Sequence, residues 1–234
     1  MRLFDPDSRF MEALSTISDL LILNLVTAVC CLPVITIGAA MTGMHYVLLK
    51  MVRKEEGYIV RSYFKSFKEN FRQAVLMWIL FLMFLGIFLL DLHLTGNSGD
   101  SQLQLPFVLR ALLVAGGGYI FLMYLYAFPL LSRFHNTVAG TISNSAKITA
   151  ACFPRSLAMA AVTILFPVLV FLFTPLLPLV LLFGLTGPGY LCALIYNSIF
   201  KKLEGDAAGD TSEFSDSAPD LSEASPGHKD QNQH

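Results

Sequence analysis

Residues 30–43 read CCLPVITIGAAMTG, and this stretch decides how the rest of the chain is arranged. It is apolar enough to lie in a membrane, but Pro33 and Gly38 interrupt it. Proline removes a backbone donor and clashes with the preceding helical turn, so it kinks or ends a helix. Either one kinked helix passes through the stretch, or a first helix over 12–32 is followed by a second. The second would begin at Thr36, whose hydroxyl can cap it.

The composition favours a membrane protein over a soluble globule. Hydrophobic residues make up 55% of the 234 residues, and charged residues only 14%. A soluble domain carries about 25% charged residues. Too little polar surface remains to cover a water-facing globule, so lipid is the expected solvent. No small-residue cleavage site follows the first apolar run, which is therefore expected to stay in place as a signal anchor.

Charge is divided between two parts of the chain. Residues 1–202 carry 15 basic and 9 acidic residues, a net charge of +6, whereas residues 203–234 hold eight acids and one base. The second segment is rich in Ser, Asp, Gly, Ala and Pro and has few residues that can form a core. We therefore predict a helical transmembrane domain over 1–202 and a disordered acidic tail over 203–234.

Four further spans follow from the length of the apolar runs, because about 20 helical residues cross about 30 Å of hydrocarbon. The run 74–90 is uninterrupted, and the run 106–131 begins with Pro106, which suits a first helical turn. The other two spans share the run 157–199, which is about twice as long as one span and contains Pro175 and Pro178, where the chain can turn. The predicted spans cover residues 74–90, 106–131, 156–173 and 178–200.

Loop charge decides between one and two helices at the start of the chain. Cytoplasmic loops carry an excess of Lys and Arg; the segment 50–72 carries seven, and the segment 91–105 carries none. One helix would leave Arg2 and Arg9 outside the cell, whereas two helices place both chain ends inside and agree with the other loops. We predict an all-α, polytopic membrane protein with six transmembrane helices, five being the alternative.

The cytoplasmic segment 58–72, YIVRSYFKSFKENFR, has a helical pattern with phenylalanines on one side and basic residues on the other. Such a helix can lie among the lipid headgroups with its aromatic side toward the acyl chains. It can instead dock a cytoplasmic partner. Nucleic acid is not an expected partner, because no nucleic-acid-binding motif accompanies the charges. The candidate contact residues are Arg61, Phe64, Lys65, Phe67, Lys68, Phe71 and Arg72.

Two polar residues, Asp19 and Asn24, fall within the first span. A carboxylate in hydrocarbon is costly, which makes Asp19 a functional candidate. It also lies close enough to the polar start to reach the interface or to pair with a basic residue. Asn24 can form a hydrogen bond to a neighbouring helix, worth about 1 kcal/mol. The spans lack the further ionisable groups that a proton relay needs.

A weaker candidate site is the cluster of Arg133, His135 and Asn136 at the predicted inner membrane surface. It could hold a phosphate or a lipid headgroup, or it could set topology by snorkelling. The sequence has neither a GxxxxGK[ST] loop nor an HExxH helix. Its four cysteines form no CxxC pair and no metal-ligand spacing with histidine. We therefore expect reduced thiols, no metal, no cofactor and no enzymatic activity.

Small residues in the spans have two interpretations. Ala39 and Gly43 are four residues apart and can let two helix backbones approach closely. The Gly116–Gly118 run and the GPGY turn at 187–190 can bend or break their helices. Broken helices line substrate sites in transporters, so packing and a substrate cavity both remain open.

A set of residues near the start of the chain carries a family resemblance. It consists of the pair Asn24 and Leu25, the LPVITIGAA turn, Tyr46, and the pattern Phe64, Phe67, Asn70, Phe71 and Ala74. With these features the chain resembles the YesL-like family of bacterial integral membrane proteins over roughly residues 1–200. That family occurs mostly in Gram-positive bacteria and offers no catalytic residues to carry over. Its genes often lie beside those of carbohydrate ABC importers and polysaccharide-degrading enzymes, which implies an accessory role in sugar uptake.

Three functional hypotheses follow. The leading one is a non-enzymatic accessory component of carbohydrate ABC import in the bacterial cytoplasmic membrane. It would contact lipid and the transporter's membrane subunits through its spans or the 58–72 helix. The alternatives are a small permease, suggested by the broken helices, and a factor in lipid-linked glycan or cell-wall polymer metabolism that uses Arg133 and His135. The sequence does not specify the substrate, the partner or the oligomeric state.

Overall fold

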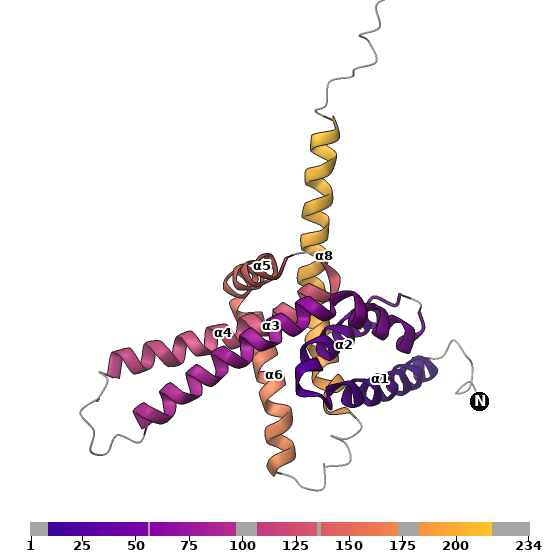
Figure 1. The fold of residues 1–234 in the computed structure, drawn as a ribbon. Helices are drawn as coiled ribbons and strands as arrows, with labels where there is room; N and C mark the ends of the chain where they lie inside the picture. The colour runs from indigo at the N-terminus through magenta and orange to yellow at the C-terminus, as the bar shows by residue number, and fades with distance from the viewer. Residues whose placement is uncertain (1–8, 56, 97–106, 135–136, 173–182, 217–234) are drawn as a thin grey trace, which may run out of the picture. The chain divides into compact units, whose positions relative to one another are not determined.

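The computed structural model describes residues 9–55, 57–96, 107–134, 137–172 and 183–216, and all regular elements in these ranges are helices (Figure 1). This confirms the predicted all-α class. The helices are α1 (Arg9–Cys31), the 3-10 helix η1 (Val34–Thr36), α2 (Ile37–Val52), α3 (Ile59–Gly96), α4 (Phe107–Arg133), α5 (Val138–Ala151), α6 (Phe153–Leu172) and α8 (Thr186–Asp216).

The chain divides into two compact units, Met1–Asn197 and Ser198–His234. The packing described below is that of the first unit. Helix α8 extends to Asp216, so residues 203–216 are helical where the sequence predicted disorder. The rest of the predicted tail, residues 217–234, lies outside the described residues.

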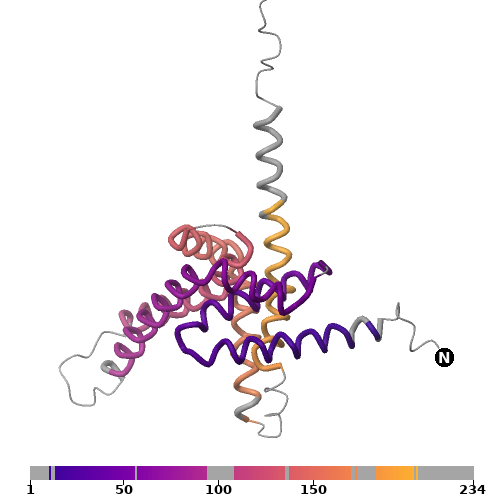
Figure 2. Tube along the Cα trace, turned by 45° about the vertical axis from the view of Figure 1, so that its right-hand side comes forward, coloured from indigo at the N-terminus to yellow at the C-terminus, as the bar shows by residue number. Residues whose placement is uncertain are grey.

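The stretch around Pro33 joins two separate helices, as the loop charges predict. Helix α1 ends at Cys31, Pro33 is extended with φ −76° and ψ 119°, and α2 begins at Ile37 after the short helix η1. Helix α2 packs against α1 (Figure 2). One kinked helix through this stretch is therefore excluded.

Thr36 stands at the N-cap position of α2, but its hydroxyl does not cap that helix, which corrects the prediction. Its Oγ1 donates to the carbonyl of Cys30 at 2.7 Å and to that of Pro33 at 2.8 Å. The hydroxyl thus satisfies a carbonyl at the C-terminal end of α1, where helical partners are missing. Thr36 stabilises the turn by ending the first helix.

Glycines allow α2 and α3 to approach closely. A Cβ added to Gly38 would lie 2.5 Å from the carbonyl oxygen of Ala74 and 2.7 Å from Cβ of Trp78. A Cβ added to Gly43 would lie 3.2 Å from the ring of Tyr63. In lipid, helices associate through such close packing, because the surrounding chains are as apolar as the side chains. The packing interpretation of Gly43 is confirmed.

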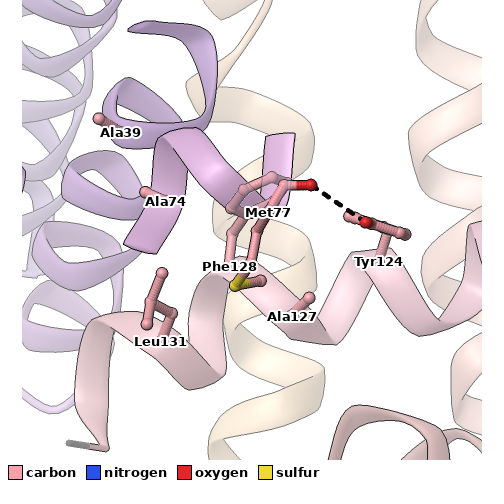
Figure 3. Packing of buried hydrophobic residues seen from close by; sticks show 7 residues of the cluster. All are labelled: Ala39, Ala74, Met77, Tyr124, Ala127, Phe128 and Leu131. Carbon is pink, nitrogen blue, oxygen red and sulfur yellow. Dashed lines mark hydrogen bonds between the residues drawn. The ribbon is translucent and has the colours of Figure 1, made fainter. Parts of the chain in front are cut away.

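A buried cluster joins α2, α3 and α4 (Figure 3). The phenol of Tyr124 donates to the backbone carbonyl of Met77 at 3.1 Å, which satisfies a polar group that would otherwise be buried alone. Figures 1 and 2 show α3 and α4 side by side, as this cluster requires. Its members are Ala39, Ala74, Met77, Tyr124, Ala127, Phe128 and Leu131.

Four helical segments among the described residues are long and apolar enough to cross a membrane: Leu14–Cys31, Val34–Val52, Ile59–His93 and Val108–Arg133. A fifth is added if α5 and α6, bent by 102° at their junction, count as one broken span. The predicted sixth span, 178–200, begins in residues outside the described ranges. The polytopic class is confirmed, and the number six stays a prediction.

Helix α3 joins two segments that the sequence predicts to be separate helices. Its 38 residues correspond to about 57 Å, well beyond the roughly 30 Å hydrocarbon layer. The predicted amphipathic helix 58–72 and the predicted span 74–90 are therefore parts of one continuous helix. No Pro or Gly interrupts residues 59–85, so nothing in the sequence breaks the helix between them. A separate helix lying flat on the membrane is not formed.

Helix α5 lies between the predicted spans 106–131 and 156–173. Its N-cap is Thr137, whose side chain accepts a hydrogen bond from the amide of Gly140 at 3.2 Å. Tyr119 of α4 donates its hydroxyl to the carbonyl of Ala146 at 2.8 Å and fastens the helix. The length of apolar runs does not reveal this helix, because small polar residues make up much of it.

The two glycine-rich segments lie within α4 and α8. The interruption predicted for the last span lies just before GPGY, where residues 184–185 form a turn. Helix α4 runs through Gly116–Gly118 without interruption. The GPGY segment at 187–190 lies in the first turn of α8. A proline there removes no helical hydrogen bond, because amides of the first turn have no partner within their own helix. A Cβ on Gly189 would lie 2.9 Å from Leu48, so this turn packs closely against α2.

Candidate functional site

Four basic residues form one exposed face at the start of α3. Arg61, Lys65, Lys68 and Arg72 are all exposed, and their spacing of four, three and four residues places them on the same side of the helix. We call these four residues the basic face. The opposite side is buried, with Tyr63 fully covered. The basic face therefore points away from the helices against which α3 packs.

The predicted aromatic stripe divides into two environments. Phe64 and Phe71 are 38% and 37% exposed beside the basic face. Phe67 is half-buried and packs against the core cluster instead of facing outward. Its ring lies 5.5 Å from that of Phe71 and 6.1 Å from that of Tyr63, measured between centroids. Phe67 therefore anchors the segment, and only the other two phenylalanines are available for contacts.

Asp19 is half-buried on the wall of a small polar pocket of about 250 Å³. Lys50, Lys54 and Glu55 line the same pocket, so the carboxylate shares it with two cations and a second acid. The pocket lies where α1, the end of α2 and the start of α3 meet. The interface position of Asp19 stays a prediction, and the pocket places two basic side chains beside its carboxylate.

The backbone that brings Lys54 to this pocket has a left-handed turn, with φ 55°. The amide of Lys54 donates to the carbonyl of Met51, and the amide of Glu55 donates to that of Lys50. This pair of bonds is the Schellman arrangement that ends a helix, in which glycine is the usual left-handed residue. Here a lysine occupies that position at the end of α2.

Asn24 connects α1 to the start of α8. It is 4% exposed, and its Oδ1 accepts hydrogen bonds from the amides of Leu185 at 3.1 Å and Thr186 at 3.4 Å. The hydroxyl of Thr186 in turn donates to the carbonyl of Leu20 at 3.2 Å. Asn24 thus supplies acceptors to amides at a helix start, which have no partner within their own helix. The hydrogen bond to another helix that the sequence suggested is confirmed.

The third predicted cluster is only partly within the described residues. Arg133 is half-buried at the last residue of α4. His135 and Asn136 lie outside the described residues. A headgroup site built from the three residues stays a prediction.

The sequence does not reveal two polar contacts with α8, one made by α2 and one by Arg53, the residue that follows α2. Nδ1 of His45 lies 3.3 Å from the hydroxyl of Tyr196, and both side chains are buried. The Nε of Arg53 donates to Oδ1 of Asn197 at 2.9 Å. The position of His45 within an apolar span indicates that this side chain needs a polar partner, because polar groups inside a membrane are otherwise costly. Its partner lies 151 residues away, so the sequence alone could not supply it.

A cavity of about 810 Å³ lies among α1, α2, α3, α4, α6 and the beginning of α8. Its walls are mainly aromatic, aliphatic and methionine side chains, and its polar groups include Asn24, His45 and Thr163. The volume is within the range of about 300–1,000 Å³ that is usual for small-molecule sites. The cavity is therefore large enough to hold a ligand.

The described residues contain no group of three His, Cys, Asp or Glu side chains placed to hold a metal ion. All four cysteines are free thiols. The site features with defined geometry in these ranges are thus an exposed basic face, a small mixed-charge pocket and an apolar cavity.

These features define an all-helical protein with several helices able to cross a membrane and an exposed basic face on one of them. Residues 20–92 are similar to a family described as "Protein of unknown function, DUF624". The matched part covers the turn at Pro33, all of α2 and the basic face. No curated protein and no solved structure matches the chain.

Proposed function

We propose that this protein is a non-enzymatic accessory component of the bacterial cytoplasmic membrane that binds the membrane subunits of a carbohydrate ABC importer. Both chain ends would face the cytoplasm. The observation that carries the proposal is the basic face, an exposed row of four cations on a rigid helix. A partner with acidic residues near the inner membrane surface fits this row.

The length of α3 supports a docking role for its basic end. A helix of 38 residues is too long for the hydrocarbon layer alone, so part of it extends into the headgroup region or beyond. The excess of Lys and Arg around its start favours the cytoplasmic side for that end. Burial of Tyr63 and Ser66 fixes the rotation of the helix, and the cations therefore stay turned outward.

The choice of partner comes from the family resemblance in the sequence. The residues that match the family of unknown function include every residue of the basic face. The YesL-like resemblance adds the genomic association with carbohydrate ABC importers. That association supplies the identity of the partner, and the exposed cations supply a surface that could bind it.

Charge reversal on the basic face should abolish recovery of the importer. The double variant Lys65→Glu and Lys68→Glu replaces two attractive charges with two repulsive ones, while neither side chain contributes to the buried side of α3. We expect at least about tenfold less transporter subunit to copurify from native membranes, a difference of about 1.4 kcal/mol. Recovery is measured by quantitative mass spectrometry after mild detergent extraction.

The matched control is the double variant Lys201→Glu and Lys202→Glu, which reverses two exposed charges on α8. It should recover the importer as well as the unmodified protein does. Equal recovery from both reversal variants would remove the basic face from the proposal. Failure of the unmodified protein to recover any importer subunit would contradict the proposed function itself.

A permease is the second candidate, and the cavity is the observation that favours it. Sugars present many hydroxyl groups, and a site that binds them must offer several hydrogen-bonding side chains. The cavity offers few, and the Asn24 oxygen already accepts bonds from two amides. Uptake of a sugar by the purified protein in liposomes without a partner would nevertheless establish this alternative.

The third hypothesis, a factor in lipid-linked glycan or cell-wall polymer metabolism, rests on Arg133 and His135. Only Arg133 lies within the described residues, so their mutual geometry adds no support. Retention of function after alanine replaces both residues would remove this hypothesis.

A further inference from the structure

We propose that the cavity among α1, α2, α3, α4, α6 and the start of α8 binds the hydrocarbon chain of a single-chain membrane amphiphile, such as a fatty acid. This inference is independent of the importer proposal, because the basic face contributes no residue to the cavity. It rests on the polarity of the walls, on one histidine and on the solvent that surrounds these helices.

The walls suit hydrocarbon better than any polar ligand. Phe81, Phe121, Phe128 and Phe166 contribute rings, and Met44 contributes a flexible thioether chain. Methionine adapts its shape to irregular apolar partners, and aromatic rings supply large contact areas. A chain of methylene groups would satisfy such walls without leaving buried polar groups unpaired.

The polar groups in the cavity match the single headgroup of such a molecule. Asn24 uses its oxygen for the start of α8, and Thr163 donates to the carbonyl of Met159 at 2.9 Å. His45 is 7% exposed, and its hydrogen bond within the described residues is made by Nδ1 to Tyr196. Its Nε2 is left to bond a carboxyl or hydroxyl group of the occupant.

The surroundings favour a lipid chain over other occupants. Four of the helices that form the walls are long and apolar enough to cross a membrane, α1 to α4, so acyl chains surround them in a bilayer. Ala28 lines the cavity and is also exposed, so an acyl chain can enter the cavity beside it. An apolar cavity open to hydrocarbon takes up hydrocarbon, because water in it would lack hydrogen-bond partners.

The chain contains its own reporter for this site. Trp78 is the single tryptophan, and its ring centroid lies 5.6 Å from that of Phe81 and 6.4 Å from that of Phe128. Both phenylalanines line the cavity. Bromine atoms on a bound chain would therefore come close to the indole and quench its fluorescence.

The experiment titrates dibrominated stearic acid into the full-length protein in nanodiscs of unbrominated phosphatidylcholine. We expect quenching of Trp78 fluorescence that saturates at a low mole fraction of the probe. Ala28→Phe places a phenyl group on the exposed part of the cavity wall and should weaken binding at least about tenfold. Ala28→Leu, a smaller change, should weaken it less and serves if the phenylalanine variant does not fold.

The matched control is Ala111→Phe, an exposed position on α4 that does not line the cavity. It should keep the saturable quenching of the unmodified protein. Quenching that rises in proportion to the probe, equally in all variants, would mean contact with bulk lipid only and would overturn the proposal. Absence of quenching in the unmodified protein would also overturn it, because the cavity would then be closed by protein.

Discussion

Alanine at Gly38 should destabilise the protein by about 1–3 kcal/mol or more, although the change adds only one methyl group. That methyl would lie 2.5 Å from the carbonyl oxygen of Ala74 and 2.7 Å from Cβ of Trp78. Neither atom is the end of a flexible side chain, so α2 and α3 would have to separate. The free energy of unfolding, measured by SDS titration in mixed micelles, tests this expectation.

The same substitution at Gly116 is the control. A Cβ there meets no atom within 4 Å, and the residue lies inside α4. Alanine should therefore stabilise that helix by about 0.5–1 kcal/mol, because glycine loses more backbone entropy on folding. Similar losses of stability at both positions would show that close contact between α2 and α3 is not the reason Gly38 is needed.

Leucine at Asn24 should cost about 1–3 kcal/mol, the penalty for burying backbone amides without partners. Leucine has a similar size but no acceptor, so the amides of Leu185 and Thr186 would lose their bonds to Oδ1. These amides lie at the start of α8, far from Asn24 in the sequence. Proteolysis of the variant near residue 185 should also become faster, because α8 loses a connection to α1.

The matched control for this prediction is Asn144→Leu on α5. Asn144 is half-buried, and its side chain makes no hydrogen bond with the described residues. This change should alter stability by less than about 0.5 kcal/mol. If both leucine variants unfold at the same SDS concentration, Asn24 does not hold α8 in the way we infer.

Local patterns predicted much of the fold. Proline kinks or ends a helix, and α1 ends at Cys31, two residues before Pro33. The four cations of the basic face were assigned to one side of a helix from their spacing alone, and all four are exposed. The spacing of Ala39 and Gly43 indicates close packing of helices as one of two interpretations, and both residues lie against neighbouring helices.

Other features depend on contacts that local patterns do not encode. Thr36 has the residue type of an N-cap, but its hydroxyl donates to the carbonyls of Cys30 and Pro33 instead of capping α2. The continuity of α3 was missed because a change from amphipathic to apolar sequence resembles the boundary between a surface helix and a span. Thr137 is an N-cap residue that indicates the start of α5, although the length of apolar runs does not reveal this helix.

The buried polar contacts were the least predictable part of the site. His45 and Tyr196 meet across 151 residues of sequence, and Arg53 and Asn197 across 144. The first pair connects α2 to α8, and the second connects the C-cap residue of α2 to α8. Helix α2 also packs against α1, α3 and α4, which makes it central to the described helices. The matched family segment contains all of α2, in agreement with this central position.

The most direct test asks which side of the membrane the basic face occupies. A single cysteine introduced as Lys68→Cys in a chain without its native cysteines is exposed to a membrane-impermeant maleimide. We predict labelling in inside-out vesicles and none in intact cells, with the reverse for Ser98→Cys in the segment 91–105, which is predicted to lie outside. Labelling of position 68 in intact cells would place the basic face outside and contradict the proposal of a cytoplasmic docking surface.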